Sequence, residues 1–484
     1  TAVSEIWNSA NMAFSLCPLL TQGTIELLTT HGSDELQATF LEKLISGEWN
    51  GTMNLTESQA GTDLARIKSK AARDGQHYRI SGQKIFITFG EHDLTDNIIH
   101  MVLARLPDAP EGVKGISLFL VPKFLVNPDG SLGERNDLKC VSIEHKLGIN
   151  ASPTAVMSYG DNDGAIGYLV GAENEGIKCM FTMMNNARLA VGLEGVAIAE
   201  RAYQQARDYA LERVQSRDAS SKSHDAVTII HHPDVKRMLL SMKSRTEATR
   251  ALAYSTAATL DTANRHPDSE KRASAQAMLD LLIPVVKAWS TDIGIDVANT
   301  GVQVHGGMGY IEETGAAQHL RDARIASIYE GTNGIQAIDL VGRKVVRENG
   351  ETIGTLIADI RRFAPKAAND DLTAIAERLE TATNALEKAT AWVVETFPTD
   401  PNAVLAGANS YLSLLGLTLG GWMMGRAAEI SLKKLEMGQG DPAFYKAKIN
   451  SARFFADQVL VEAASHCEKI VSGSVSITQS DFSS

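Results

Sequence analysis

A long helical pattern without a break is the strongest constraint on this fold. From residue 174 to residue 214 the stretch "NEGIKCMFTMMNNARLAVGLEGVAIAERAYQQARDYALERV" keeps its apolar residues on one persistent stripe, as an amphipathic helix does. A helix of this length needs partners of similar length, and two more helical patterns follow at residues 233–264 and 268–304. The three segments together predict an antiparallel helical bundle.

A β-rich pattern precedes this bundle. Between residues 47 and 172, short runs of β-formers alternate with turn signals such as Asp74-Gly75. We expect these runs to form a compact antiparallel barrel or sandwich. Residues 1–46 have apolar side chains at helical spacing after the candidate N-cap Ser33, so the chain is expected to begin with helix.

Residues 350–475 predict further helices after the bundle. The stretch "LGLTLGGWMMG" contains four glycines, which are Gly416, Gly420, Gly421 and Gly425. This spacing is known from helices that pack closely in membranes, but the stretch is short and has polar flanks. Close packing between helices in a protein core is therefore the favoured interpretation.

Composition and charge narrow the class of function. The 484 residues are 44% hydrophobic and 21% charged, which is typical of a soluble globular protein. A net charge of -12 disfavours nucleic acid and anionic lipid as partners, so small molecules or proteins are expected. Four widely spaced cysteines indicate neither a zinc site nor a disulfide framework, and no export signal or membrane span is visible, so we expect a cytoplasmic protein. The chain does not begin with methionine, as is typical of a processed or truncated product.

Two β-region segments contain polar groups suited to a flat, polar ligand. In "NLTESQAGTDLA", residues 54–65, hydroxyl and small residues surround Gly61, where backbone N–H groups could approach an anion or a heterocycle edge. In "GQKIFITFG", residues 82–90, period-two alternation predicts Phe86 and Thr88 on one face, where they could stack on and bond to a ring system. Taken singly, the first segment is better explained as an ordinary turn with hydroxyl caps, and the second as an ordinary β core.

Two further segments lie in the helical region. "QVHGGMGYIEETG", residues 303–315, places glycines directly after a helix, where they could cap it or let a bound group approach the backbone. "RIASIYEGTNGIQ", residues 324–336, contains Glu330 at the end of an apolar stretch. A carboxylate there could favour a helix N-terminus or act as a general base in a closed pocket. The pair His231-His232 precedes Pro233 and is expected to cap a helix rather than bind a metal.

Together these segments resemble signatures of the acyl-CoA dehydrogenase family of flavoenzymes. "LTE-x-x-AGTD" resembles the first family signature, "Q-x-x-GG-x-GY" followed by "LRDARI" the second, and "IYEGTN" the segment of the catalytic base. Their order and spacing agree over nearly the whole chain. The resemblance implies an α+β fold with four parts. These are a remnant of the N-terminal helical domain (1–46), a middle antiparallel β domain (47–172), a C-terminal four-helix bundle (173–349) and an extra helical domain (350–484).

The resemblance also implies a reaction. Glu330 would remove the α-proton of an acyl-CoA thioester while the β-hydrogen leaves as hydride to N5 of FAD, which gives a trans-2-enoyl-CoA. A dry, apolar pocket would raise the basicity of that carboxylate. The backbone N–H of Glu330 and a flavin hydroxyl would bind the thioester oxygen.

Other site residues follow from the same resemblance. The implied FAD-binding residues are Leu55, Thr56, Gly61, Thr62, Phe86, Thr88, Arg213, Gln303, Gly306, Gly307 and Thr332. The implied substrate-binding residues are Asn185, Arg188, Tyr329 and Gly331. Because the family's second signature and an arginine such as Arg213 reach the FAD of a neighbouring subunit, a homodimer or a dimer of dimers is expected.

The resemblance is closest to long family members with a C-terminal extension. "EHKLGINASPTAV" and "YEGTNGIQAIDLVGRK" are similar to bacterial 3-methylmercaptopropionyl-CoA dehydrogenases, so that thioester or another short-chain acyl-CoA is the expected substrate, with an electron-transferring flavoprotein as acceptor. The β-rich region begins after residue 46, earlier than in the family, which implies that the first helices are missing. Alternatives are an acyl-CoA oxidase that uses oxygen, a flavin-containing DNA-protection protein on the same fold, and a fragment without FAD.

Overall fold

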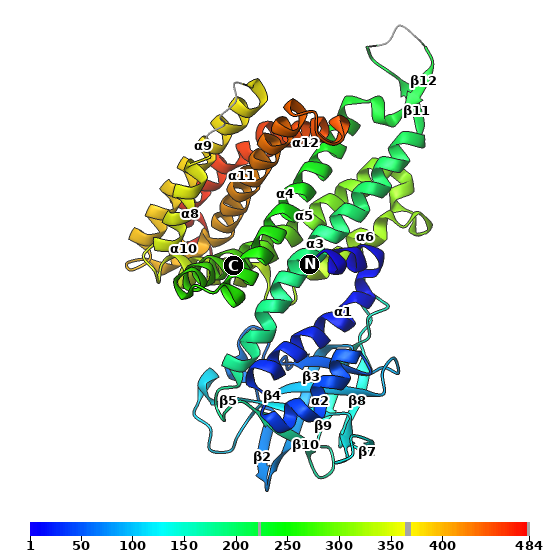
Figure 1. The fold of residues 1–484 in the computed structure, drawn as a ribbon, viewed down its shortest axis with the longest axis vertical. Coiled ribbons are helices and arrows are strands. Elements are labelled where there is room, and N and C mark those ends of the chain that lie inside the picture. Colours follow the sequence, from blue (N-terminus) through cyan, green and yellow to red (C-terminus); the bar gives the residue numbers. More distant parts are fainter. Residues whose placement is uncertain (221–223, 364–368, 482–484) are drawn as a thin grey trace. The chain divides into compact units, whose positions relative to one another are not determined.

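The computed structural model describes residues 1–220, 224–363 and 369–481 (Figure 1). They divide into two units, one formed by Ala10–Ala187 and the other by Thr1–Ser9 with Arg188–Ser484. The predicted helical start, β region and helical bundle are all present as secondary structure. The exact domain boundaries stay a prediction, because the long helix α3 (Gly176–Glu212) has residues in both units.

Two helices begin the chain. Helix α1 (Ala2–His31) contains a break at Asn11, whose φ of -157° and ψ of 94° are not helical. Helix α2 (Asp34–Ser46) begins as expected after Ser33, whose side chain accepts a hydrogen bond from the Leu36 N–H. It ends at Gly47 with a φ of 81°, a left-handed conformation that favours glycine.

The β domain contains one eight-stranded sheet. Its strands are β1 (Trp49–Asn54), β2 (Lys70–Asp74), β3 (His77–Thr88), β4 (Asn97–Arg105), β5 (Ile116–Pro122), β8 (Leu138–Ile143), β9 (Thr154–Tyr159) and β10 (Ala165–Val170). The strand order is β1-β4-β5-β10-β3-β9-β8, and β2 pairs with both β3 and β4. These pairings close β4, β5, β10, β3 and β2 into a ring, so the barrel interpretation is confirmed. A separate hairpin consists of β6 (Phe124–Val126) and β7 (Leu132–Arg135).

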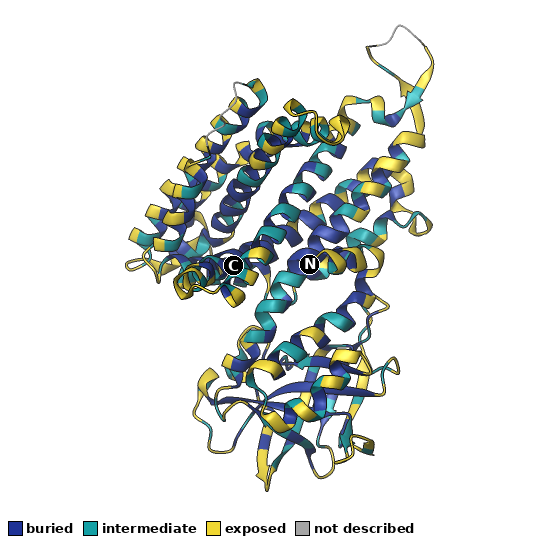
Figure 2. Ribbon diagram, viewed as in Figure 1, coloured by how far each residue is buried: buried dark blue, intermediate teal, exposed yellow. Residues whose placement is uncertain are grey.

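The expectation of an antiparallel sheet was wrong for two pairs of strands, which run parallel. Strand β1 runs parallel to β4 over six residue pairs, and β2 meets β4 in parallel at Lys70 and Arg105. Parallel neighbours need a long connection, and the β2–β3 hairpin between β1 and β4 supplies it. All the residues of β4 except Arg105 are buried, so this strand lies in the middle of the core (Figure 2).

The other unit is helical. Its long helices are α4 (Pro233–Arg265), α5 (Ser269–His305), α9 (Asp370–Thr396) and α11 (Ala408–Glu436), with α3 beside them. Shorter helices are α6 (Ala316–Ala323), α7 (Asn333–Asp339), α8 (Glu351–Arg361), α10 (Pro401–Ala406), α12 (Pro442–Phe454), α13 (Ala463–Ser472) and α14 (Ser474–Thr478). A small hairpin of β11 (Val214–Arg217) and β12 (Ala226–Thr228) follows α3. The short connection between α4 and α5 makes these two helices antiparallel neighbours, as predicted.

The glycines of α11 allow close helix packing. A Cβ atom at Gly416 or Gly420 would lie only 2.5 to 2.6 Å from ring atoms of Trp289 on α5. Only a residue without a side chain fits there, which confirms core packing as the role of these glycines. Within the described ranges, no helix is long and apolar enough to cross a membrane.

Candidate active site

Glu330 lies on a strained turn before α7. Its φ is 56° and that of Gly331 is 81°, so two consecutive residues are in the left-handed region. A Cβ atom at Gly331 would approach the side-chain amide of Gln336 to 2.7 Å, so the second position favours glycine sterically as well. The N-cap of α7 is Thr332, which accepts from the Ile335 N–H at 3.3 Å. Glu330 is therefore not itself a cap, and its strained conformation is typical of a functional position.

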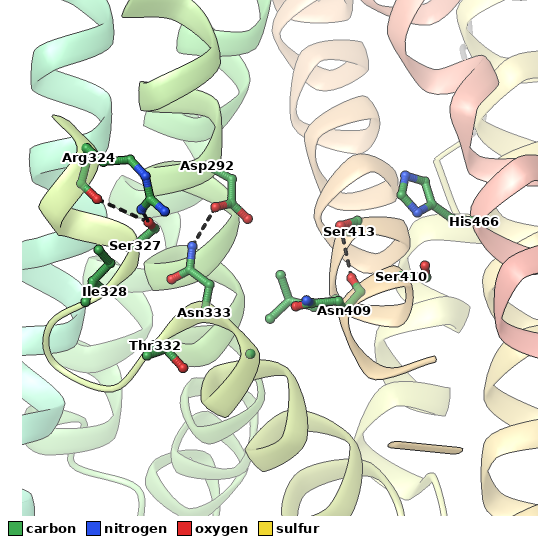
Figure 3. A pocket seen from close by; sticks show the side chains of 12 residues that line it. Asp292, Arg324, Ser327, Ile328, Thr332, Asn333, Asn409, Ser410, Ser413 and His466 are labelled. Carbon is green, nitrogen blue, oxygen red and sulfur yellow. Dashed lines mark hydrogen bonds between the residues drawn. The ribbon is translucent and has the colours of Figure 1, made fainter. Parts of the chain in front are cut away.

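A buried network holds this turn against α5. The Lys287 ammonium donates to the carbonyl of Gly331 and to Oδ1 of Asn333, both at 2.9 Å. The amide nitrogen of Asn333 in turn donates to Asp292 on α5 at 2.7 Å (Figure 3). Since Lys287 is fully buried and Asn333 nearly so, these bonds are shielded from water.

Two positive charges near Glu330 partly offset the effect of burial on the pKa of its carboxyl group. Burial raises the pKa of the half-buried Glu330 carboxyl to about 7, while the positive charges of Arg188 and Lys287 act against this shift. Burial likewise lowers the pKa of Arg188, and the charges of Asp339 and Glu330 oppose that shift. A carboxyl group with a pKa near neutrality can both take and release a proton at physiological pH.

Lys287 and Glu194 were not predicted from the sequence as site residues. Glu194 is fully buried on α3 and accepts a hydrogen bond from the Tyr329 hydroxyl. The sequence does contain a pattern that could have identified both residues. Each is a single charged residue inside an apolar run, Glu194 in "VGLEGVA" and Lys287 in "IPVVKAW". Buried charged side chains are rare without a partner or a function.

In the β domain the two predicted flavin segments lie side by side. The Ile85 N–H donates to the Thr56 carbonyl at 2.9 Å, and the buried Lys84 ammonium donates to the Leu55 carbonyl at 3.0 Å. Leu55 is buried and Thr56 half-buried. The structure thus brings together segments that the sequence separates by about thirty residues.

The strand alternation around Phe86 is less regular than expected. Phe86 has a φ of 61° at a shift in the register between β3 and β9, so the period-two rule is interrupted there. Its ring is 59% exposed, which is unusual for phenylalanine in a strand. Thr88 is half-buried, whereas Gly61 and Thr62 are exposed in the loop after β1.

Arg213 and the predicted residues of the second signature lie at the ends of α3 and α5. The rings of Tyr209 and His305 stack at 4.5 Å between centroids, which places these two helix ends together. The predicted residues here, which are Arg213, Gln303, Gly306 and Gly307, are all exposed. The backbone at Gly306 and Gly307 faces open space, because a Cβ atom at either would meet nothing within 4 Å. Asn185 is half-buried on α3, in the unit of the β domain.

A polar pocket of about 540 Å³ lies beside α7. Figure 3 shows Arg324, Thr332 and Asn333 on one side and Asn409 of α11 on the other. The full lining consists of Asp292, Arg324, Ser327, Ile328, Thr332, Asn333, Gly334, Asn409, Ser410, Leu412, Ser413 and His466. The pocket offers hydrogen-bond donors and acceptors to a polar ligand.

No group of side chains suited to a metal ion occurs among the residues that the structure describes. His232 is the N-cap of α4, but its ring does not cap the helix, since Nε2 lies 2.7 Å from the carbonyl of Gln215.

Comparison with known proteins identifies the family. The model for the acyl-CoA dehydrogenase middle domain matches residues 52–161, that for the acyl-CoA dehydrogenase C-terminal domain residues 174–345, and that described as acetyl-CoA dehydrogenase C-terminal like residues 356–481. These three matches span most of the β domain and both helical regions.

Two relatives and one solved structure extend this result. A 3-methylmercaptopropionyl-CoA dehydrogenase of Ruegeria pomeroyi is 52% identical over 97% of this chain and 79% of its own. A butyryl-CoA dehydrogenase of Syntrophomonas wolfei is 36% identical over 95% of this chain and 77% of its own. An acyl-CoA dehydrogenase of Bacillus anthracis complexed with FAD has the same fold, with a TM-score of 0.75 at 20% identity over 97% of this chain and 76% of its own. The comparisons give no support to an oxidase. The chain belongs to the acyl-CoA dehydrogenase family of FAD-dependent enzymes.

Proposed function

We propose that this enzyme oxidises a short-chain acyl-CoA, with 3-methylmercaptopropionyl-CoA as the leading substrate, and that Glu330 is the catalytic base. The substrate proposal rests on the 52% identity to the Ruegeria pomeroyi enzyme. The observation that carries the assignment of the base is the strained left-handed turn at Glu330 and Gly331, which the buried Lys287 holds against α5. Burial there raises the pKa of the Glu330 carboxyl group to about 7. A base of that pKa is matched to proton abstraction at neutral pH.

The chemistry of the chain's own residues follows from this geometry. Glu330 takes the α-proton of the thioester, and Arg188 and Lys287 keep enough of the carboxyl group ionised to do so. The Lys287 and Asn333 network fixes the turn, so little reorganisation is needed when the proton moves. Tyr329 and Gly331 are further proposed substrate contacts at this turn, and Asn185, in the unit of the β domain, is proposed as another. FAD, when bound, supplies the acceptor for the β-hydride.

The residues proposed for FAD are suited to that group. An exposed Phe86 ring beside the Leu55 and Thr56 loop offers a flat apolar face to a ring system. Thr332 lines the polar pocket of about 540 Å³, which can take a polar part of the cofactor. Gly61, Thr62 and Thr88 are the remaining proposed contacts in the β domain.

A second subunit is part of the proposal. Arg213, Gln303, Gly306 and Gly307 are exposed in the single chain, and they are proposed to reach the FAD of a neighbouring subunit in a homodimer or a dimer of dimers. Sedimentation velocity of the FAD-loaded protein tests this directly. A monomer that retains FAD and full activity contradicts the proposal.

The reduced flavin is proposed to pass its electrons to an electron-transferring flavoprotein in the cytoplasm. All four cysteines are free in the structure, which suits a reducing compartment. Substrate-dependent reduction of an added electron-transferring flavoprotein, with little peroxide formed in air, is the expected result. Rapid peroxide formation without that acceptor would instead indicate oxygen as the acceptor.

An absorbance experiment tests the reaction itself. We expect anaerobic 3-methylmercaptopropionyl-CoA to bleach the bound flavin faster than butyryl-CoA at equal concentration. Glu330→Gln should retain FAD but lose about 100-fold to 10,000-fold in the rate of bleaching. The matched control is Glu377→Gln, at an exposed glutamate on α9, which should react like the wild type. Normal bleaching by Glu330→Gln rules out the proposed base.

A further inference from the structure

Glu194 is a carboxyl group in the tightest part of the helical bundle. Glycines lie two residues before it and one residue after it on α3. A Cβ atom at Gly192 would lie 2.6 Å from the side chain of Val286, and one at Gly195 would lie 2.4 Å from the carbonyl of Ser290. The backbones of α3 and α5 are therefore in direct contact on both sides of Glu194. Close packing of this kind holds a buried side chain in one position.

The hydrogen bonds of Glu194 suit a neutral carboxyl group better than a charged one. Oε2 accepts from the Tyr329 hydroxyl, while Oε1 is buried and has no partner within the described part of the chain. The ammonium of Lys287 is already used by Gly331 and Asn333. A buried carboxylate with one donor is poorly compensated, so the protonated form is favoured.

The charged and titratable groups that act on Glu194 come from two elements. Tyr329 and Glu330 belong to the turn, and Lys287 belongs to α5. Burial raises the pKa of Glu194 to about 8, and the negative charge of Glu330 acts in the same direction, whereas Tyr329 and Lys287 oppose the shift. Arg188 on α3 acts on Glu330, whose pKa is about 7. Two cations, Arg188 and Lys287, favour the charged form of Glu330, whereas Lys287 alone does so for Glu194, so we expect Glu330 to ionise first as the pH rises.

We propose that Glu194 is a positioning residue of the active centre, which holds Tyr329 beside the base and keeps its own proton while Glu330 is ionised. Between the pKa values of the two groups, the pair then carries a single negative charge, which lies on Glu330. A second negative charge on Glu194 would oppose the charge that develops on the thioester when the α-proton leaves. The inference rests on the proposed role of Glu330 as the base.

The rate of flavin reduction as a function of pH tests this inference. In the wild-type holoenzyme, the rate of anaerobic reduction by acyl-CoA should rise through about pH 7 as Glu330 ionises and fall above about pH 8 as Glu194 ionises. Glu194→Gln has the same volume, keeps an oxygen acceptor for Tyr329 and cannot ionise. It should keep the acid limb, lose the alkaline fall and, at about pH 9, exceed the wild type by up to about tenfold.

Controls separate a positioning role from a purely structural one. Glu377→Gln should keep both limbs of the wild-type profile. A structural role for Glu194 would lower the rate of Glu194→Gln equally at every pH and leave the alkaline fall in place, which would overturn the inference. If Glu194→Gln binds FAD poorly, Tyr329→Phe provides the second variant, because loss of its hydroxyl should move the alkaline limb to higher pH.

Infrared spectroscopy provides a test that needs no substrate. At about pH 7.5, below the pKa of Glu194, the difference between wild type and Glu194→Gln should contain the C=O stretch of a protonated carboxyl group. Carboxylate bands in its place would contradict the inference even if the enzyme is active. If no acyl-CoA bleaches the wild-type flavin, the proposed function fails, and the infrared result still decides whether Glu194 carries a proton.

Discussion

Two buried glutamates, Glu57 in the β domain and Glu194 in the helical bundle, have pKa values that are shifted in opposite directions. Burial acts against ionisation of Glu57, yet the charge and hydrogen bond of Lys84 and the bonds from Ser69 and Lys68 lower its pKa to about 2. Lys84 lies 2.8 Å away and the Ser69 hydroxyl 2.7 Å away. Glu194 is as well buried, but among the described residues only the Tyr329 hydroxyl donates to it, and burial raises its pKa to about 8.

The difference shows that donors, and not burial alone, decide what a buried carboxyl group does. With a cation and several donors, Glu57 is ionised at neutral pH and holds the loop of Leu55 to β3 through Lys84. With its second oxygen unpaired among the described residues, Glu194 can change its protonation near neutral pH. The first arrangement stabilises a binding loop, and the second is suited to proton chemistry.

The largest expected effect comes from removing the cation beside Glu57. Lys84→Met leaves a buried carboxylate without its charge partner, so we expect the free energy of unfolding to fall by about 3–5 kcal/mol. Urea unfolding followed by circular dichroism measures this change. The control is Lys139→Met, which removes an exposed partner of Asp161 and should cost at most about 1 kcal/mol. Equal losses of unfolding free energy in the two variants would show that the buried Lys84–Glu57 pair contributes no more to stability than an exposed pair.

The second prediction concerns the dependence of stability on pH. Between the ordinary carboxyl value of about 4.5 and the folded value of about 8, the unfolded state releases the Glu194 proton and the folded state keeps it. The wild type should therefore lose stability relative to Glu194→Gln by up to about 1.4 kcal/mol per pH unit in this window, and the difference should level off above about pH 8. Unfolding free energies measured across the window give the slope.

The substitution Glu57→Gln should change the dependence of stability on pH in the opposite direction to Glu194→Gln. The stabilising charge of Glu57 is fully present above the ordinary carboxyl pKa of about 4.5 and is lost as the pH falls through about 2. Glu57→Gln should therefore be less stable than the wild type near neutrality, and the gap should close on acidification. If the stability difference from the wild type changes with pH in the same direction for Glu57→Gln and Glu194→Gln, the proposed contrast between the two glutamates is contradicted.

Local patterns in the sequence predicted much of the fold. The cap at Ser33, the long helix α3 and the glycines of α11 are confirmed, because each depends on residues close in sequence or on the lack of a side chain. The parallel pairing of β1 with β4 was missed, since the order of strands depends on contacts far apart in the chain. The irregular backbone at Phe86 was missed for a related reason, because a change of register involves the partner strand β9.

The candidate site was predicted less completely than the fold. The motif around Glu330 led to the family, which is confirmed, whereas the roles of the individual site residues stay predictions. Glu194 and Lys287 lie 136 and 43 positions before Glu330, and helical periodicity indicates only that their positions face a core. Which groups meet in that core follows from helix packing, so the network of Lys287, Gly331 and Asn333 became visible only in the structure.

The third prediction concerns Lys287, the cation of the bundle. Lys287→Met removes the shortest hydrogen bonds to the Gly331 carbonyl and to Oδ1 of Asn333, and it leaves only the longer ones from Gln336 at 3.3 Å and Thr291 at 3.4 Å, which should cost about 1–3 kcal/mol of stability. It also removes a positive charge that opposes the raised pKa of Glu330, so this pKa should rise above about 7. The acid limb of the rate of flavin reduction should then move to higher pH. An acid limb that stays in place would show that Arg188 alone sets the charge of the base.

The smallest expected effect comes from Tyr329→Phe, which removes the hydroxyl group that donates to Glu194 and keeps the ring. A single hydrogen bond is worth about 0.5–1.5 kcal/mol, so a small loss of stability is expected. Because the Tyr329 hydroxyl acts to lower the pKa of Glu194, its loss should raise the pKa of Glu194 above about 8. The difference between the pKa values of Glu194 and Glu57 should then become larger. Infrared titration of the buried carboxyl group measures the shift, with Glu194→Gln as the reference that lacks the band. A pKa that falls in Tyr329→Phe would mean that water replaces the hydroxyl and compensates the charge, so that Tyr329 serves to exclude solvent.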